Sequence, residues 1–428
     1  MPQRNRINNR KKIADTYLPF FLILIAIRLL ITLIEPYEVD MSGYLAWSRY
    51  LADHGSSGLY QSFHIVYAPL YQYFLWFSGI IANIFHMPDA AHIYLIKLWP
   101  FLFECIGAWL IIRFSDRIKR WNAGMLAAIF YLFNPAIFIN TSVWGQFDAI
   151  PATMLLGTVY LFETKKPNLG ALLFLAAVLT KPQSGLLLPI VLYLYFRHFR
   201  MDMKSILRLI TGFCAGIALY LFIVLPFYSP TGSAGITVPR FLDPFYWLFD
   251  LYLRSLTDYP YATANGMNFW MLAGGQIQPD TMPFMGLSYQ TWGNIMLFVS
   301  VIYIFYLLYK GKGSSEALIY CSFLILFSAF MWMTKMHERY LLPAIIFIVL
   351  AAIWQRKHII TAILISICVF ANQLIIYLKS FYEIYWLYRW DTTAIAVAAL
   401  TFIVYGLALF NGYCIFASNR KRVIITKA

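Results

Sequence analysis

The sequence predicts an all-α membrane protein that crosses the bilayer many times and forms a single domain over residues 1–428. Two observations predict this fold class. First, 61% of the residues are hydrophobic and only 12% are charged, whereas soluble proteins carry about a quarter charged residues. Second, the charges cluster between long apolar runs, a pattern typical of transmembrane helices. The net charge of +14 therefore indicates membrane topology and not a nucleic-acid partner.

Thirteen apolar runs follow one another along the chain. Several are shorter than the roughly 20 residues that a straight transmembrane helix needs, so we expect these to extend into polar neighbours, tilt or stop partway. The runs cover residues 17–34, 69–85, 92–114, 123–139, 149–162, 169–180, 185–196, 206–227, 291–309, 317–333, 340–354, 359–378 and 392–417.

The positive charges select the topology. If the run 69–85 lies in the outer interface instead of crossing the membrane, cytoplasmic segments hold 23 of the 33 lysines and arginines. These include the five basic residues among 4–12 and the tail 420–427. The positive-inside rule then predicts twelve transmembrane helices with both termini cytoplasmic. Tyr71, Tyr73, Trp76 and Phe77 suit an interfacial helix in the run that does not cross. We expect a bacterial plasma membrane, because retention signals are absent and the tail is basic.

With this topology, polar residues at several helix ends collect on the external face. A first external loop, residues 35–91, contains the interfacial helices, and a long external loop covers residues 229–290. Three shorter polar segments, 144–148, 181–183 and 335–340, end at the same face. Convergence of carboxylates, amides and cations at one membrane surface predicts a site there.

Asp40 is the first candidate catalytic residue. It lies about six residues beyond the first apolar run, so it can be held at the membrane surface. A carboxylate in that place can act as a general base on an acceptor hydroxyl. The alternative is an ordinary solvated loop carboxylate, as Glu35, Glu38 or Asp53 could be.

Asp148 is the second candidate catalytic residue, in the segment Trp144-Gly145-Gln146-Phe147-Asp148. Asp148 could bind sugar hydroxyls or orient the acceptor, and Trp144 and Gln146 could face the sugar. The alternative is a helix cap, because Ala149 and Pro151 follow. The two interpretations are compatible.

Two further segments supply candidate donor-binding residues. Lys181-Pro182-Gln183 places a cation at an outer helix end, where it could hold a lipid phosphate or simply snorkel to the interface. His337 and Arg339 are predicted to donate charge-assisted hydrogen bonds to a departing phosphate, beside the ring of Tyr340. Glu338 could pair with Arg339. A zinc site is not indicated, because the second histidine of His-Glu-x-x-His is absent.

Three other features have competing interpretations. Arg28 and Glu104 lie inside apolar runs and are predicted to form a structural ion pair; contact between Arg28 and a substrate phosphate is the alternative. Asn265 and Asn268 offer amides that could bind a sugar or belong to a polar loop. Asn140-Thr141-Ser142 fits a glycosylation acceptor, a pattern that often occurs by chance.

As a set, these motifs resemble the GT-C superfamily of integral-membrane glycosyltransferases, which use polyprenyl-phosphate sugars. The resemblance is greatest to bacterial relatives of the second mannosyltransferase of glycosylphosphatidylinositol synthesis. The motifs are the Asp40 loop, Phe133-Asn134-Pro135-Ala136, Val143 to Asp148, Lys181-Pro182-Gln183, Asn265 to Trp270, and His337 to Pro343.

The resemblance implies a GT-C-type fold and an inverting transferase whose site faces outward. Asp40 would be the base and Asp148 a second carboxylate, while Lys181, Gln183, His337 and Arg339 would bind the donor phosphate or sugar. Mannose would be the sugar and a glycan or glycolipid the acceptor, at a membrane lipid surface. No cofactor or metal is expected, because an Asp-x-Asp motif is absent. The lack of a large C-terminal soluble domain argues against a protein acceptor.

Two other function classes remain open from the sequence. A lipid or sugar transporter would also have about twelve helices, with broken spans, although polar residues at one face and no visible inverted repeat argue against it. A polysaccharide polymerase or ligase would share the external site and the lipid-linked donor.

Overall fold

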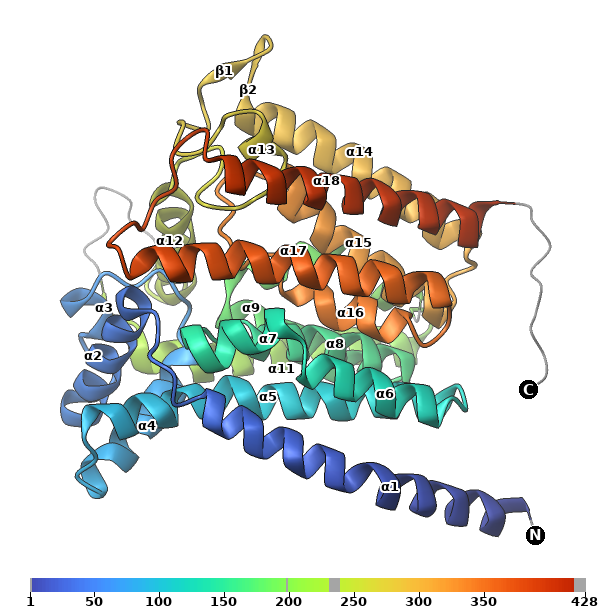
Figure 1. Cartoon of the computed structure of the whole chain (residues 1–428). Helices are drawn as coiled ribbons and strands as arrows, with labels where there is room; N and C mark the ends of the chain where they lie inside the picture. Colours follow the sequence, from blue (N-terminus) through green and yellow to red (C-terminus); the bar gives the residue numbers. More distant parts are fainter. Residues whose placement is uncertain (1, 198, 231–238, 419–428) are drawn as a thin grey trace.

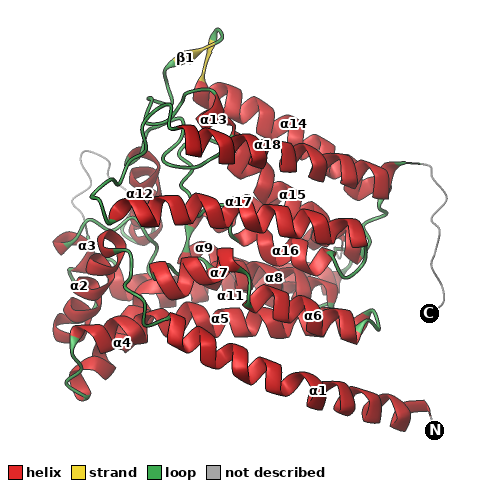
Figure 2. Ribbon diagram, viewed as in Figure 1, coloured by secondary structure: helices red, strands yellow, loops and turns green. Residues whose placement is uncertain are grey.

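The computed structural model describes residues 2–197, 199–230 and 239–418, with side chains from residue 16 onward. The structure is 74% helical, and its sheet is a single antiparallel pair of two-residue strands, β1 (Pro283–Phe284) and β2 (Leu287–Ser288), within the described ranges. Figure 2 shows helices throughout the bundle. The predicted all-α class is confirmed.

The helices of the first half are α1 (Pro2–Ile31), α2 (Glu38–His54), α3 (Leu59–Ser62), α4 (Leu70–Ile84), α5 (Asp89–Arg117), α6 (Trp121–Leu132), α7 (Pro135–Phe138), the π-helix η1 (Ile139–Trp144), α8 (Ala149–Glu163) and α9 (Pro167–Thr180). Those of the second half are the 3₁₀-helix η2 (Pro182–Leu187), α10 (Leu188–Arg197), α11 (Met203–Val224), η3 (Leu225–Phe227), α12 (Asp243–Thr257), α13 (Phe269–Leu272), α14 (Tyr289–Lys310), α15 (Ser315–Trp332), α16 (Pro343–Ala351), α17 (Arg356–Ser380), α18 (Thr392–Gly412) and the π-helix η4 (Tyr413–Ala417).

Six helices in the described ranges are long and apolar enough to cross a membrane, or seven if the bent pair of α6 and α7–η1 counts as one span. Three shorter apolar helices cover 16–31, α8 and α9. The chain is therefore an integral multi-pass protein, while the total of twelve spans stays a prediction. The apolar run 123–139 is not one straight helix. The chain bends by 42° between α6 and α7–η1, at Asn134-Pro135, where a proline ring disfavours helical geometry in the preceding residue. That this run crosses the membrane as a single span stays a prediction.

Helices α1 and α18 place the two ends of the chain on one side of the bundle. Figure 1 shows α1 beginning, and α18 ending, at the right-hand end. Helices α2, α3, α4, α12 and α13 and the β-hairpin gather at the opposite end. This arrangement agrees with two termini on one membrane face. The side chains of the basic residues among 4–12 and the whole tail 420–427 lie outside the described residues, so the cytoplasmic placement of the termini stays a prediction.

The run 69–85, predicted to lie at the interface, forms the separate helix α4 beside α2 at that opposite end (Figure 1). The two helices pack closely. A Cβ on Gly79 of α4 would lie 2.2 Å from the backbone oxygen of Ser48 in α2, and the Ser48 hydroxyl donates to the backbone oxygen of Leu75 at 2.5 Å. Glycine therefore lets α4 approach α2 backbone to backbone.

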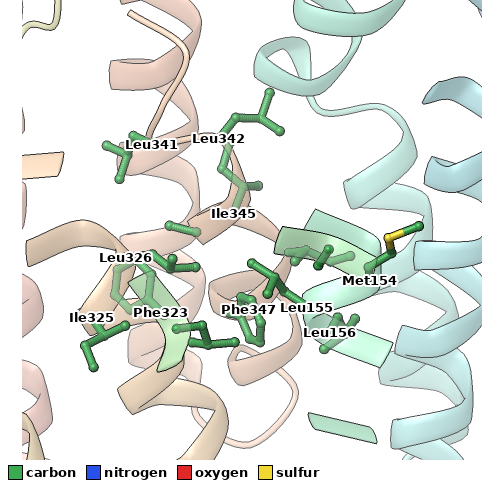
Figure 3. Packing of buried hydrophobic residues seen from close by; sticks show 14 of the residues in the cluster. Met154, Leu155, Leu156, Phe323, Ile325, Leu326, Leu341, Leu342, Ile345 and Phe347 are labelled. Carbon is green, nitrogen blue, oxygen red and sulfur yellow. The ribbon is translucent and has the colours of Figure 1, made fainter. Parts of the chain in front are cut away.

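The hydrophobic core lies around α8, α15 and α16. In Figure 3, apolar side chains of α8, α15 and α16 point toward one another, among them Leu155, Phe323 and Phe347, which are all buried. Helix α16 has only nine residues, and every residue after Pro343, from Ala344 to Ala351, is buried. A short helix is tolerated at membrane depth because protein, not lipid, surrounds the backbone at its ends. The polar loops that follow these buried helices are thereby held in fixed positions.

Candidate active site

Asp40 lies in the first turn of α2, where a carboxylate is favoured by the helix dipole. Its Oδ2 accepts hydrogen bonds from Trp144 Nε1 at 2.7 Å and from Gln146 Nε2 at 2.6 Å. Oδ1 receives no hydrogen bond from the described part of the chain. Asp40 is partly exposed. One oxygen thus fixes the carboxylate, and the other is available to an incoming group.

Two aromatic residues close to Asp40 in the sequence hold this arrangement. Tyr37, which precedes α2, donates its backbone N–H to the Trp144 carbonyl at 3.1 Å, and its ring stacks on Trp144 with centroids 4.3 Å apart. The buried Tyr44 hydroxyl donates to Gln146 Oε1 at 3.1 Å. Because that oxygen accepts from Tyr44, the amide nitrogen of Gln146 is the atom that faces Asp40.

The segment that carries Trp144 and Gln146 has an unusual backbone. Asn134 caps α7 by accepting from the Ala136 N–H at 3.1 Å, and the chain then forms the π-helix η1. Short π-helices are rare in proteins overall, but those that do occur often lie at functional sites. Gly145 follows with a φ of 90°, and a Cβ there would lie 2.2 Å from Met41 Cε. The positive φ strains any residue with a side chain, so glycine is favoured at this turn.

Asp148 occupies a different setting. It stands at the N-cap position of α8, yet its side chain makes no capping hydrogen bond, so the cap interpretation is wrong. Instead, Oδ1 pairs with Lys181 Nζ, and Oδ2 accepts from Asn140 Nδ2 at 3.2 Å. Both charged residues are 2% exposed. The carboxylate is fully engaged in a buried pair.

Lys181 follows the last residue of α9 and points inward. Its Nζ lies over the rings of Phe147 at 5.1 Å, Tyr340 at 5.4 Å and Tyr67 at 5.8 Å. The snorkelling alternative is therefore wrong. Burial lowers the pKa of Lys181, the ion pair with Asp148 opposes that shift, and the charge of Arg339 adds to it. The charged form of Lys181 is stabilised when an anion enters the site.

The segment His337-Glu338-Arg339-Tyr340 closes the cluster. Arg339 NH1 donates to Glu338 Oε1, which confirms the predicted pair. The guanidinium lies 5.9 Å from the ring centroids of both Trp144 and Tyr340. Its Nε is buried without a hydrogen-bond partner. A buried donor without a partner is costly, so this atom marks a place where a ligand oxygen would be favoured.

His337 differs from its predicted role in one respect. Its ring lies 4.8 Å from Tyr259 and 5.0 Å from Tyr340, centroid to centroid. Burial, with the charges of Arg339 and Lys181, holds the pKa of His337 well below its usual value. These effects favour the neutral imidazole. A charged role for His337 therefore requires an anion beside it.

A cavity of about 430 Å³ opens next to this cluster. A smaller cavity of about 20 Å³ touches Asp148 and Lys181. Gln183 and Tyr340 line both, and Gln183 Oε1 is buried without a partner. The other polar residues that line the larger cavity are Ser255, Tyr252, Tyr259, Gln290, Asn294, Thr334, Lys335 and His337, and its apolar walls include Leu186, Leu256, Met333 and Met336.

Asn265 and Asn268 are not brought into the cluster. Asn265 Oδ1 accepts from Gln276 Nε2 at 2.7 Å and from the Leu387 N–H at 3.1 Å. Asn268 caps α13 and donates to the Phe330 carbonyl at 2.9 Å. Their loop in turn binds the Met336 carbonyl through the N–H groups of Ala264 and Gly266. The contacts described hold the 335–340 segment in place, and a sugar contact by either asparagine stays a prediction.

Sequence reasoning missed several residues of the site. Lys97 is buried inside α5, and its Nζ donates to the carbonyls of Ile34 at 2.6 Å and Thr32 at 3.2 Å, where α1 ends. A lysine inside an apolar run was a usable signal. Asn140 is also buried and contacts Asp148, so the glycosylation interpretation is wrong. Tyr44 and Tyr67 gave no pattern that separates them from interfacial aromatics.

The described residues contain no group of three His, Cys, Asp or Glu side chains that could hold a metal ion. Independence of metal and cofactor stays a prediction.

No protein-family model and no curated protein matches this sequence. Among solved structures, ArnT from Cupriavidus metallidurans in the apo state is similar at 11% identity and a TM-score of 0.48, over 94% of this chain and 77% of that one. The Archaeoglobus fulgidus oligosaccharyltransferase tethered with an acceptor peptide is similar at 15% identity and a TM-score of 0.44, over 94% of this chain and 56% of that one. At these values the likeness by itself assigns no activity to this chain.

Proposed function

We propose that this chain is an inverting membrane glycosyltransferase that moves a sugar from a polyprenyl-phosphate donor to a hydroxyl acceptor, with Asp40 as the general base. The observation that carries the proposal is the Asp40 carboxylate. Trp144 and Gln146 fix one oxygen, and the other accepts no hydrogen bond from the residues that the structure describes. Buried cations for a phosphate lie nearby, since Arg339 contacts the ring of the same Trp144.

The proposed reaction is a single displacement. Asp40 Oδ1 takes the proton of the acceptor hydroxyl as its oxygen bonds to the anomeric carbon. The bond between that carbon and the phosphate oxygen breaks, and the polyprenyl phosphate leaves with the electron pair. Arg339 and Lys181 stabilise the charge that develops on the phosphate. Neither cation helps unless it binds that charge more tightly in the transition state than in the ground state.

The cavity of about 430 Å³ is proposed to receive the donor head group. Amides of Gln183, Gln290 and Asn294 can bind sugar hydroxyls, and Lys335 and His337 lie beside them. Leu186, Leu256 and the two methionines give an apolar wall for the first isoprene units. Pockets for small ligands have this composition: apolar walls and a few converging polar groups. Mannose is proposed as the sugar from the motif resemblance, and a glycan or glycolipid as the acceptor.

A transporter is less well supported. A carrier places its substrate site near mid-membrane, with charged groups exposed to a cavity. Here the buried charges within helices, Arg28, Glu104 and Lys97, bind one another or protein carbonyl groups. The larger cavity is lined instead by the loop segment 333–337 and by the ends of helices.

The test uses purified protein in lipid nanodiscs with a panel of radiolabelled polyprenyl-phosphate sugars and lipid-extract acceptors. Consumption of one donor with an inverted anomeric configuration in the product, read by NMR, supports the proposal. The same protein in sealed liposomes is assayed for movement of each donor across the bilayer. Donor movement without consumption would contradict the proposal and establish the carrier.

A further inference from the structure

A buried charged network contacts the π-helix η1 that leads into the candidate site. Arg28 of α1 and Glu104 of α5 form an ion pair with NH2 and Oε2 2.6 Å apart, and the side chains are 1% and 0% exposed. The guanidinium also lies over the rings of Phe101 and Phe138. A buried ion pair does not by itself explain stability, since apolar residues of similar volume often stabilise as well or better. Its other partners indicate what it does.

Those other partners belong to the segment that leads into the site. Arg28 NH2 donates to Thr141 Oγ1 and to Ser142 Oγ, each at 3.0 Å. Thr141 in turn donates to Glu104 Oε1, and Arg28 NH1 donates to the Leu132 carbonyl at 2.9 Å, in the last turn of α6. The ion pair is therefore hydrogen-bonded to residues on both sides of the break at Asn134-Pro135.

Thr141 and Ser142 lie in the middle of the π-helix η1, and the residues that serve the two carboxylates flank them. Asn140 donates to Asp148, and Trp144 donates to Asp40. The Gln146 N–H donates to the Asn140 carbonyl at 2.8 Å, which closes the turn that presents the Gln146 amide to Asp40. The π-helix thus supplies one hydrogen bond to each carboxylate, from Trp144 to Asp40 and from Asn140 to Asp148.

We propose that Arg28 and Glu104 are positioning residues, which hold η1 through Thr141 and Ser142 so that Trp144 and Gln146 meet Asp40 and Asn140 meets Asp148. This inference rests on the proposed function and extends it, because neither charged residue contacts the larger cavity. A rigid support of this kind is what a site needs when small displacements of reacting groups are costly.

The test removes the hydrogen bonds between Arg28 and η1 without leaving a buried charge unpaired. Thr141→Val and Ser142→Ala delete only the two hydroxyl groups, and the Arg28–Glu104 pair stays intact. Matched controls are Thr158→Val and Ser322→Ala, whose buried hydroxyls donate to carbonyls of their own helices. Thr141→Ser, which keeps the hydroxyl, is the conservative rescue. Each variant is assayed with the donor that the wild type consumes.

We expect kcat of the Thr141→Val/Ser142→Ala double variant to fall about 10- to 100-fold, because displacement of a reacting group by about 1 Å can cost about 10²-fold. The KM for the donor should change less than kcat, since Lys181 and Arg339 lie on other segments. Thr141→Ser, which keeps the hydroxyl, should restore kcat.

Hydrogen exchange of peptides covering residues 139–148 gives a readout that needs no activity. Faster exchange in the double variant, with no change in the controls, is expected. If the wild type consumes no donor, the proposed function fails. Faster exchange of residues 139–148 in the double variant would then still show that the network holds η1 in place. Wild-type exchange in the double variant, or a wild-type kcat in a folded double variant, would overturn the inference.

Discussion

The two carboxylates of the candidate site lie on either side of the same short turn, yet their surroundings are opposite. Asp40 is partly exposed, accepts two neutral hydrogen bonds at one oxygen, and leaves the other oxygen free. Asp148 is buried, and its two oxygens bind Lys181 and Asn140. Different environments assign different roles to chemically identical groups. The comparison supports the proposal that Asp40 exchanges a proton, whereas the contacts of Asp148 hold the Lys181 cation in place.

The largest expected effect breaks the Asp40 side of this comparison. Asp40→Asn should lower kcat by about 10²- to 10⁴-fold, the usual contribution of a general base. Its melting temperature should stay near that of the wild type, because an amide oxygen can still accept from Trp144. The measurement is sugar transfer in nanodiscs. Asp53→Asn, an exposed carboxylate on the same helix α2, is the control and should keep wild-type kcat.

Substitution of Asp148 should lower the stability of the folded protein. Asp148→Asn leaves Lys181 buried without its counter-charge, and breaking a buried pair typically costs about 3–5 kcal/mol. Adding Lys181→Met should recover most of that loss, because an apolar residue of similar volume replaces the remaining charge. Thermal unfolding in detergent measures both. Equal melting temperatures for the single and double variants would mean that the pair is not the buried unit described.

Trp144→Phe sharpens the comparison, since Trp144 touches Asp40 but not Asp148. The substitution keeps a ring to stack on Tyr37 and removes one hydrogen bond to a carboxylate, worth about 1.5–3 kcal/mol when charged. We expect kcat for sugar transfer to fall about tenfold. Trp292→Phe, which removes a hydrogen bond to the carbonyl of Phe284, controls for the general effect of losing an indole. A wild-type kcat in Trp144→Phe would contradict the assigned contact.

The smallest expected effect concerns His337, whose pKa burial holds well below its usual value of 6.5. The unfolded chain then binds a proton that the folded chain does not, so stability is full above about pH 6.5 and falls as the pH drops. One such group costs about 1.4 kcal/mol per pH unit. His337→Gln should therefore lose less stability than the wild type between pH 7 and pH 5, as read by thermal unfolding. Parallel losses in both proteins would indicate a charged histidine.

The sequence allowed much of this architecture to be predicted. Apolar runs gave the multi-pass helical class, and positive charges singled out the run 69–85, which is the separate helix α4 in the structure. Residues of three predicted segments, 144–148, 181–183 and 337–340, do meet beside Asp40 and Asp148. These features follow from composition and from charges at helix ends, which are local properties.

What could not be predicted depends on how distant segments pack. The π-helix η1 (Ile139–Trp144) carries no local sequence signal that separates a π-helix from an α-helix. The roles of Asp40 and Asp148 differ only because Lys181 arrives from α9 and Trp144 from the turn. Asn265 and Asn268 looked like ligand contacts because exposed and buried amides have the same sequence signature. Their partners, Gln276 and the carbonyl of Phe330, are set by tertiary structure.

The most direct test of the division of labour measures donor binding beside donor turnover. The dissociation constant of the consumed donor is determined for wild type, Asp40→Asn and the Asp148→Asn/Lys181→Met double variant. We predict that Asp40→Asn binds the donor as the wild type does but does not transfer the sugar. The double variant should bind about 10- to 100-fold more weakly, since it lacks a charged contact to the phosphate. Wild-type turnover by Asp40→Asn, or the same loss of affinity in both variants, would contradict the account.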